Sequence, residues 1–172
     1  MDGSKIFEYR RTFPNEEIMA YMYVSSPVKM IVGRIHLGKR IDINTWKEQY
    51  KADKEVCERI EDFLTRHTYA MPVLSFQMTK EIELEILRKF NPNFVCPQMY
   101  YYLDNYPELF DYIKHTATDI GEPRINSFEN IDKFQVSSLV TRQTTDVSNV
   151  QMAYMMLIRT AIRSPLMLIF GH

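Results

Sequence analysis

The chain has 172 residues, of which 45% are hydrophobic and 25% charged, a composition that excludes a protein disordered throughout. Its 21 basic and 22 acidic residues give a formal net charge of −1, which excludes a uniformly basic protein that coats duplex DNA. The sequence has no apolar run of about eighteen residues and no secretory signal at its start, so we expect no membrane span and a cytoplasmic location.

The N-terminal part of the chain predicts strands, because its apolar residues alternate or run continuously over lengths typical of strands. The expected bounds are Lys5–Arg11, Ile18–Val24 and Met30–Leu37. In the first strand, alternation places Glu8 and Arg10 on one face. Phe7 and Tyr9 then point to the opposite face. In the third strand, Gly33 indicates a bend or a close backbone approach.

A helical period follows these strands. Residues spaced four, three, four, three and four positions apart form one stripe, which consists of Trp46, Tyr50, Asp53, Cys57, Ile60 and Leu64. The spacing predicts a single helix over 44–64 whose stripe, thickened by Val56 and Phe63, faces the core. The elements expected next are a strand at Tyr69–Met78, a helix at Glu81–Phe90, a strand at Met99–Leu103 and a short helix at Pro107–Ile113.

The composition changes after residue 115. Residues 116–135 are polar and typical of a connector, residues 146–163 have a helical period, and Leu166–Phe170 are continuously apolar. We therefore expect a β-rich mixed domain at 1–115, followed by a connector and a helical or helix-plus-strand tail at 116–172. Because an apolar tail needs cover, we expect it to pack on the domain of its own chain or of a neighbouring copy, which would give a homo-oligomer.

The common catalytic motifs are absent from the sequence. It contains no G-x-S-x-G, P-loop, H-E-x-x-H or G-x-G-x-x-G, its four histidines are scattered, and its two cysteines cannot make a four-ligand zinc site. We therefore assign no catalytic residue, no metal ligand and no cofactor. The remaining candidate is the strand face of Glu8 and Arg10, with Lys5 entering from the preceding turn. These three side chains either hold a polar ligand or form an exposed ion pair worth less than about 1 kcal/mol.

The same segment resembles a known signature. Gly3, Lys5, Glu8 and Arg10 match every fixed position of the motif G-x-K-x-x-E-x-R of ASCH domains, which belong to the PUA-like superfamily. The stretch AYMYVSSPVKMIVGRI resembles the second and third strands of that family. LRKFNPNFVCPQMYYYLDN resembles a bacterial subgroup described as ASCH-related predicted transcriptional regulators. The resemblance covers about residues 2–115, and the strand and helix that usually precede the signature are missing here.

The resemblance implies an α+β fold, a small PUA-like β-barrel with flanking helices, to which the helical tail is added. It also implies a regulatory module that holds RNA or a nucleotide-like ligand in a cleft. The residues expected at that cleft are Lys5, Glu8, Arg10, Arg11, Ser25 and Ser26, the two serines near its rim. Arg10→Ala is then expected to remove binding with little loss of stability.

Two alternatives to a binding module stay open. Some ASCH proteins resemble an amidohydrolase that acts on acetylated cytidine, which implies a small hydrolase of a modified nucleoside with Lys5 and Glu8 as nucleophile or base. Those proteins carry a threonine at the strand position that Glu8 occupies here, which speaks against this activity. The other alternative is an oligomerising structural protein whose tail mediates self-association.

Overall fold

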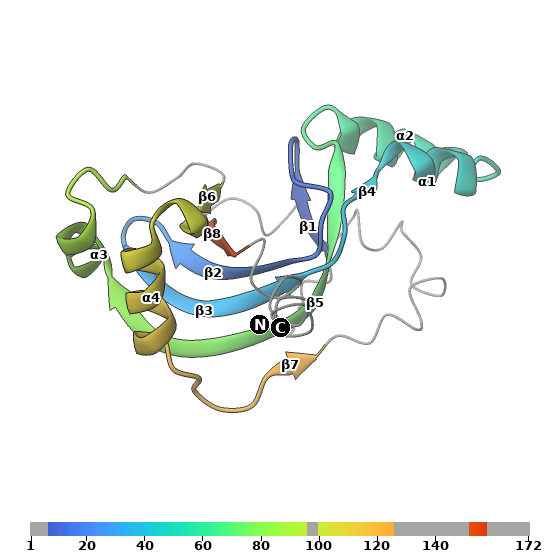
Figure 1. The fold of residues 1–172 in the computed structure, drawn as a ribbon. Coiled ribbons are helices and arrows are strands. Elements are labelled where there is room, and N and C mark those ends of the chain that lie inside the picture. The colour runs from blue at the N-terminus through green and yellow to red at the C-terminus, as the bar shows by residue number, and fades with distance from the viewer. Residues whose placement is uncertain (1–6, 96–99, 126–151, 158–172) are drawn as a thin grey trace, which may run out of the picture. The chain divides into compact units, whose positions relative to one another are not determined.

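The computed structural model describes residues 7–95, 100–125 and 152–157 (Figure 1). The chain forms two compact units, which we call the first and the second unit. The first consists of Met1–Glu17, Leu37–Leu74 and Ile125–Asn149, and the second of Ile18–His36, Ser75–Arg124 and Val150–His172. The long strand β5 (Tyr69–Glu83) contributes to both units, because the division falls within it.

The strands of the first unit are β1 (Phe7–Arg10), β4 (Ile41–Asp42) and the beginning of β5, and both short strands pair with β5 in the antiparallel sense. In the register, Tyr9 and Ile41 both lie opposite Ala70. Arg10 and Asp42 both lie opposite Tyr69. At each of these paired positions, the side chains of β1, β4 and β5 therefore point to the same side of the sheet.

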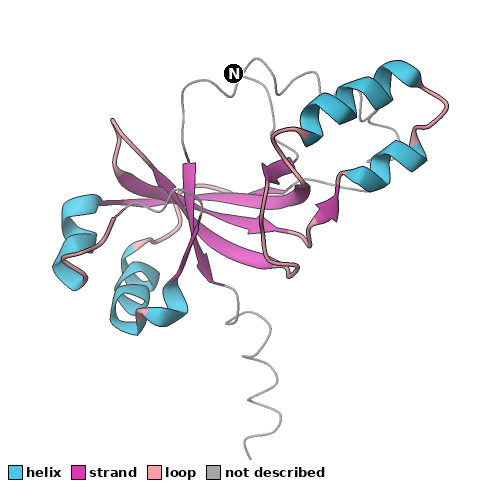
Figure 2. Ribbon diagram, turned by 90° about the horizontal axis from the view of Figure 1, so that it is seen from above, coloured by secondary structure: helices cyan, strands magenta, loops and turns pink. Residues whose placement is uncertain are grey.

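The helical stripe predicted from the sequence is present but broken into two helices, α1 (Asn44–Gln49) and α2 (Lys54–Leu64), which lie side by side (Figure 2). The single predicted helix is wrong because Asp53 starts a new one: its side chain accepts a hydrogen bond from the backbone N–H of Val56 at 3.1 Å, as a helix cap does. The core-facing prediction is confirmed for Trp46, Tyr50, Val56, Ile60 and Leu64, whereas Asp53 is exposed. The core of the first unit contains Phe7, Tyr9, Ile43, Trp46, Val56, Ile60, Phe63 and Ala70, with Tyr50 and Leu64 packed against it.

The sheet of the second unit has the strand order β5-β3-β2-β8-β6. Its further strands are β2 (Ile18–Val24), β3 (Met30–Leu37), β6 (Tyr100–Tyr102) and β8 (Met152–Leu157), of which β2 and β3 have the predicted bounds. Strand β8 is antiparallel to β2 and parallel to β6. Among the described residues the outer strands β5 and β6 do not pair with each other, so this sheet is open rather than the predicted barrel. The α+β class itself is confirmed.

Strand β8 corrects the predicted helical tail. Residues 152–157 form a strand at the centre of the predicted helix, paired with β2 along its whole length. A short apolar run fits either a strand or a buried helix, and here the free edge of β2 decides between them. The rest of the tail, residues 126–151 and 158–172 with Leu166–Phe170, lies outside the described residues.

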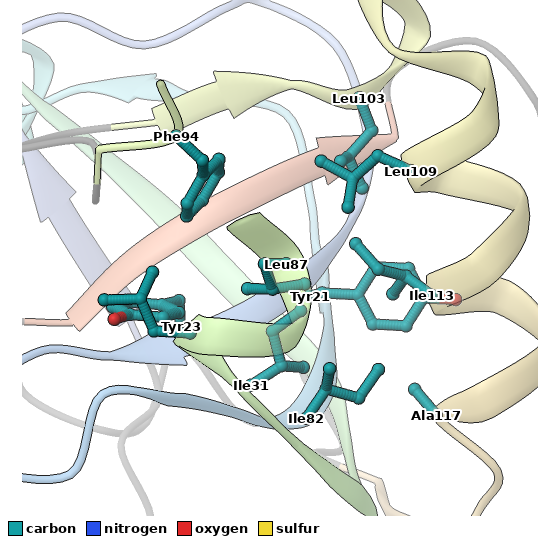
Figure 3. Packing of buried hydrophobic residues seen from close by; sticks show 11 residues of the cluster. Tyr21, Tyr23, Ile31, Ile82, Leu87, Phe94, Leu103, Leu109, Ile113 and Ala117 are labelled. Carbon is teal, nitrogen blue, oxygen red and sulfur yellow. The ribbon is translucent and has the colours of Figure 1, made fainter. Parts of the chain in front are cut away.

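The helices of the second unit are α3 (Leu84–Phe90), the 3-10 turn η1 (Leu103–Asn105) and α4 (Pro107–Thr116). Figure 3 shows side chains from these helices and from the sheet converging on one core. The buried members of this core are Tyr21, Tyr23, Ile31, Ile82, Leu84, Leu87, Phe94, Leu103, Leu109, Ile113 and Ala117. The burial explains why short helices persist here, since packing rather than propensity stabilises them.

Part of the predicted connector lies along β5. The N–H of Ile120 donates to the carbonyl of Met78 at 2.9 Å, and the N–H of Lys80 donates to the carbonyl of Thr118 at 2.7 Å. The short strand β7 (Arg124–Ile125) also pairs with β5. These bonds extend β5 to Glu83, five residues beyond its predicted end. No helix among the described residues has the length and hydrophobicity needed to cross a membrane.

Candidate functional site

Antiparallel pairing sorts the side chains of the first unit onto two faces, because residues directly opposite each other point to the same side of a sheet. Tyr9, Ala70 and Ile41 belong to the face that packs under the helices. The next set across the strands, Arg10, Tyr69 and Asp42, therefore points to the opposite face. Glu8, two residues before Arg10, lies on that face as well. We call the face of Glu8, Arg10, Tyr69 and Asp42 the polar face.

Glu8 and Arg10 form an ion pair on the polar face. Nη2 of Arg10 lies 3.0 Å from Oε1 of Glu8, and the two side chains are 19% and 6% exposed, respectively. The sequence prediction that these two side chains share a face is confirmed. The pair is too buried to be the exposed surface pair considered above. Because breaking a buried pair leaves a desolvated charge behind, it costs more than breaking a surface pair.

The polar face opens toward the end of β1. Glu8 and, opposite it on β5, Met71 are buried. Arg10 and its partner Tyr69 are half-buried, and Arg11 is exposed. A ligand would therefore reach the guanidinium of Arg10 before the carboxylate of Glu8.

Arg40 and Tyr69 form a second feature of the polar face. The guanidinium carbon of Arg40 lies 4.0 Å from the centroid of the Tyr69 ring, within the range of a cation–π contact. A guanidinium nitrogen of Arg40 also donates to the backbone carbonyl of Phe13. Neither residue was singled out in the sequence, because nothing local to residues 40 and 69 indicates that their strands pair.

The other predicted site residues are distributed as follows. Lys5 lies outside the described residues, and Arg11 follows Arg10 at the end of β1. Ser25 and Ser26 belong to the second unit, in the turn after β2, where the Ser25 carbonyl accepts from the N–H of Val28 at 3.1 Å. The structure thus brings Glu8 and Arg10 together, while the contribution of the two serines stays a prediction.

A metal ion or a reactive thiol would be another possible centre of chemistry. Over residues 7–95 and 100–125, no group of three or more His, Cys, Asp or Glu side chains is placed to hold a metal ion. The thiol of Cys57 is free and half-buried, 3.4 Å from the carbonyl oxygen of Tyr50. This environment suits a small side chain near the start of a helix.

Tyr9 lies on the opposite side of the sheet from the polar face, and its hydroxyl has a raised pKa. Burial raises the pKa of Tyr9 above its ordinary value of about 10, and the neighbouring Glu8 carboxylate raises this pKa further. In the second unit, burial likewise raises the pKa values of Tyr21 and Tyr101. These hydroxyls stay protonated in the folded chain at pH values where an unfolded tyrosine ionises.

The Tyr9→Phe variant is expected to lose stability less steeply at alkaline pH than the wild type. Folded Tyr9 binds its proton more tightly than unfolded Tyr9, so its contribution is complete below about pH 10 and is lost as the pH rises further. Denaturant unfolding between pH 8 and 11 measures the slopes. Tyr21 and Tyr101 keep their own contributions, so the variant's decline becomes shallower without vanishing. Equal slopes for the two proteins would show that Tyr9 does not carry this effect.

Similarity to known proteins is found at the level of solved structures. No family model matches the chain, and no curated protein matches it. The crystal structure of an ASCH protein from Zymomonas mobilis is 19% identical, covers 77% of this chain and 79% of its own, and has a TM-score of 0.36. Two single-substitution variants of that protein are each 20% identical, cover 80% and 78% of this chain and 84% of their own, and have TM-scores of 0.40 and 0.38. TM-scores below 0.5 do not establish a common fold, so the resemblance to ASCH domains depends on the sequence, above all on the signature of Gly3, Lys5, Glu8 and Arg10.

Proposed function

We propose that this chain is an ASCH-type, PUA-like module of the cytoplasm that binds RNA or a nucleotide-like ligand at the polar face of the first unit. The observation that carries the proposal is the Glu8–Arg10 pair, joined at 3.0 Å on the face opposite the core that contains Tyr9 and Ala70. Both residues are fixed positions of the signature. A regulatory role, as implied by the bacterial subgroup, is part of the same proposal.

The two side chains offer complementary chemistry to a nucleotide. The planar guanidinium of Arg10 donates to phosphate or base carbonyl oxygens in a fixed fork. The carboxylate of Glu8 accepts from the amino or imino groups of a base edge. One ligand that presents a carbonyl oxygen beside an N–H group would therefore engage both side chains at once.

The charge distribution suits a short ligand. The formal net charge is −1, yet Arg10, Arg11, Lys39 and Arg40 are close in sequence or in register to the polar face. Nucleic-acid affinity grows with the number of phosphates that a protein neutralises, and so does its dependence on salt. We therefore expect modest affinity, a footprint of a few nucleotides and a shallow salt dependence.

A variant that neutralises the pair tests the proposal. Arg10→Ala alone is unsuitable, because it would leave the buried Glu8 carboxylate without this guanidinium. The sequence predicted a small loss of stability for this variant, and the burial of the pair changes that expectation to a large loss. The double variant Glu8→Gln with Arg10→Gln removes both charges together. The matched control is Glu85→Gln with Arg88→Gln, an exposed ion pair of 3.1 Å on α3 in the second unit.

Fluorescence anisotropy with labelled single-stranded RNA of ten nucleotides, at low salt, measures the result. We expect the Glu8/Arg10 double variant to bind at least about tenfold more weakly, as the loss of one charge-assisted contact predicts, and the control to bind like the wild type. Equal weakening of both variants would point to general charge instead of this site. A wild-type chain that binds neither RNA nor nucleotides would refute the proposal, and hydrolysis of acetylated cytidine would favour the hydrolase alternative.

A further inference from the structure

The polar face contains an aromatic side chain in addition to the signature pair. Tyr69 is the first residue of β5 and lies directly opposite Arg10 on β1 and opposite Asp42 on β4. Side chains directly opposite each other in antiparallel strands have Cβ atoms about 5 Å apart. The phenol ring is half-buried, and among the described residues it is not part of the core that contains Tyr9 and Ala70. Tyr69 is thus the cross-strand neighbour of Arg10, at the less buried end of the polar face.

Arg40 holds this ring in place. Its guanidinium lies over the ring at 4.0 Å from the centroid and also donates to the carbonyl of Phe13. The hydrogen bond fixes the guanidinium, and the guanidinium fixes the ring, within the first unit. A ring fixed before a ligand arrives loses little freedom on binding, which favours affinity. The same arginine adds a positive charge beside the ring.

We propose that Tyr69 is a stacking platform for a second base, so that the site takes a single-stranded oligonucleotide of at least two nucleotides rather than a mononucleotide. Aromatic rings flanked by basic side chains recur in proteins that bind single-stranded nucleic acid, because every base has a face that can stack. One nucleotide would contact Glu8 and Arg10, its neighbour would stack on the face of the Tyr69 ring that points away from Arg40, and Arg10 and Arg40 would add positive charge near the phosphate between them. This inference rests on the proposed function and extends it.

The structure suggests variants that separate stacking from folding. Tyr69→Leu removes the ring and keeps an apolar side chain, whereas Tyr69→Phe keeps the ring. Arg40→Gln retains a donor for the Phe13 carbonyl and removes the charge. The control is Tyr50→Leu, a half-buried tyrosine of the same unit that packs against the core instead. All variants are compared at a temperature where circular dichroism shows each to be folded.

The probe is a hexanucleotide RNA of uridine with one 2-aminopurine, whose fluorescence is quenched when the base stacks. We expect the wild type and Tyr69→Phe to change this fluorescence on binding and Tyr69→Leu not to do so. Tyr69→Leu is also expected to weaken binding of the hexanucleotide about tenfold, as the loss of one stacked base predicts, with uridine monophosphate unaffected. Arg40→Gln is expected to weaken binding about threefold and to reduce the salt dependence. The Tyr50→Leu control should bind like the wild type.

Two failures are distinguishable. If Tyr69→Leu binds the hexanucleotide and quenches the probe like the wild type, while the Glu8/Arg10 double variant loses binding, the stacking inference is overturned and the proposed function stands. If the wild type binds no hexanucleotide and no mononucleotide, the proposed function fails and the inference fails with it.

Discussion

Removal of residues 145–172 is expected to unfold the second unit and to make the chain aggregate. Strand β8 pairs with β2 over six residues, Met19–Val24 against Met152–Leu157, and it also holds β6. Without β8, β6 loses its partner and β2 presents an unpaired edge, a configuration that promotes association between chains. We expect low solubility and the loss of the cooperative melting transition. A soluble truncated chain with an unchanged melting temperature would show that β8 contributes nothing to the sheet.

A point variant in the full chain checks the same strand. Met155 lies opposite Tyr21 on β2 and opposite Tyr101 on β6, so proline there removes a backbone donor between two strands. Met155→Pro is expected to lower the melting temperature strongly, whereas Met155→Val, which keeps the N–H, is expected to be mild. Similar melting temperatures for the two variants would contradict the pairing.

Self-association through the tail stays a prediction. An apolar tail that pairs with a neighbouring copy would give a symmetric dimer by strand exchange. Light scattering of the full chain over a range of concentrations measures its mass. A mass that rises to that of a dimer would favour packing on a neighbouring copy, and a monomer at every concentration would favour packing within one chain, as β8 packs against β2.

Gly33→Ala is expected to destabilise the second unit by about 1–3 kcal/mol, the usual cost of forcing extra volume into a packed site. A Cβ at Gly33 would lie 2.6 Å from the backbone oxygen of Gln77 and 3.0 Å from the ring of Phe76. Backbone of the neighbouring strand cannot move aside without disturbing the pairing of β3 with β5. The close approach that the sequence indicated at Gly33 is thus confirmed.

Gly38→Ala is the matched control for this variant. A Cβ at Gly38 would meet a ring carbon of Pro72 at 3.3 Å, a contact that a small shift relieves. Denaturant unfolding of both variants is expected to give a clearly larger loss of unfolding free energy for Gly33→Ala, and for a chain of this size each kcal/mol lowers the melting temperature by about 2–4 °C. An equal loss for both glycines would refute the close packing at Gly33.

Local periodicity alone determined much of this protein. The bounds of β2 and β3 follow from apolar runs, and the shared face of Glu8 and Arg10 follows from the two-residue repeat of a strand. The burial of Trp46, Val56 and Ile60 follows from helical spacing. These features were predictable because each depends only on residues a few positions apart.

The tertiary structure decided what local periodicity leaves open. The helical spacing of residues 46–64 is not interrupted between α1 and α2. Only the N-terminal cap at Asp53 marks the point where the chain changes direction and the second helix begins. The sequence of residues 152–157 fits a helix or a strand, and pairing with the edge of β2 makes it a strand. The arrangement of Arg10, Arg40 and Tyr69 depends on the register of β5 with β1 and with β4, two strands that lie far from it in sequence. Such a register is set by long-range pairing and core packing together, so no single segment encodes it.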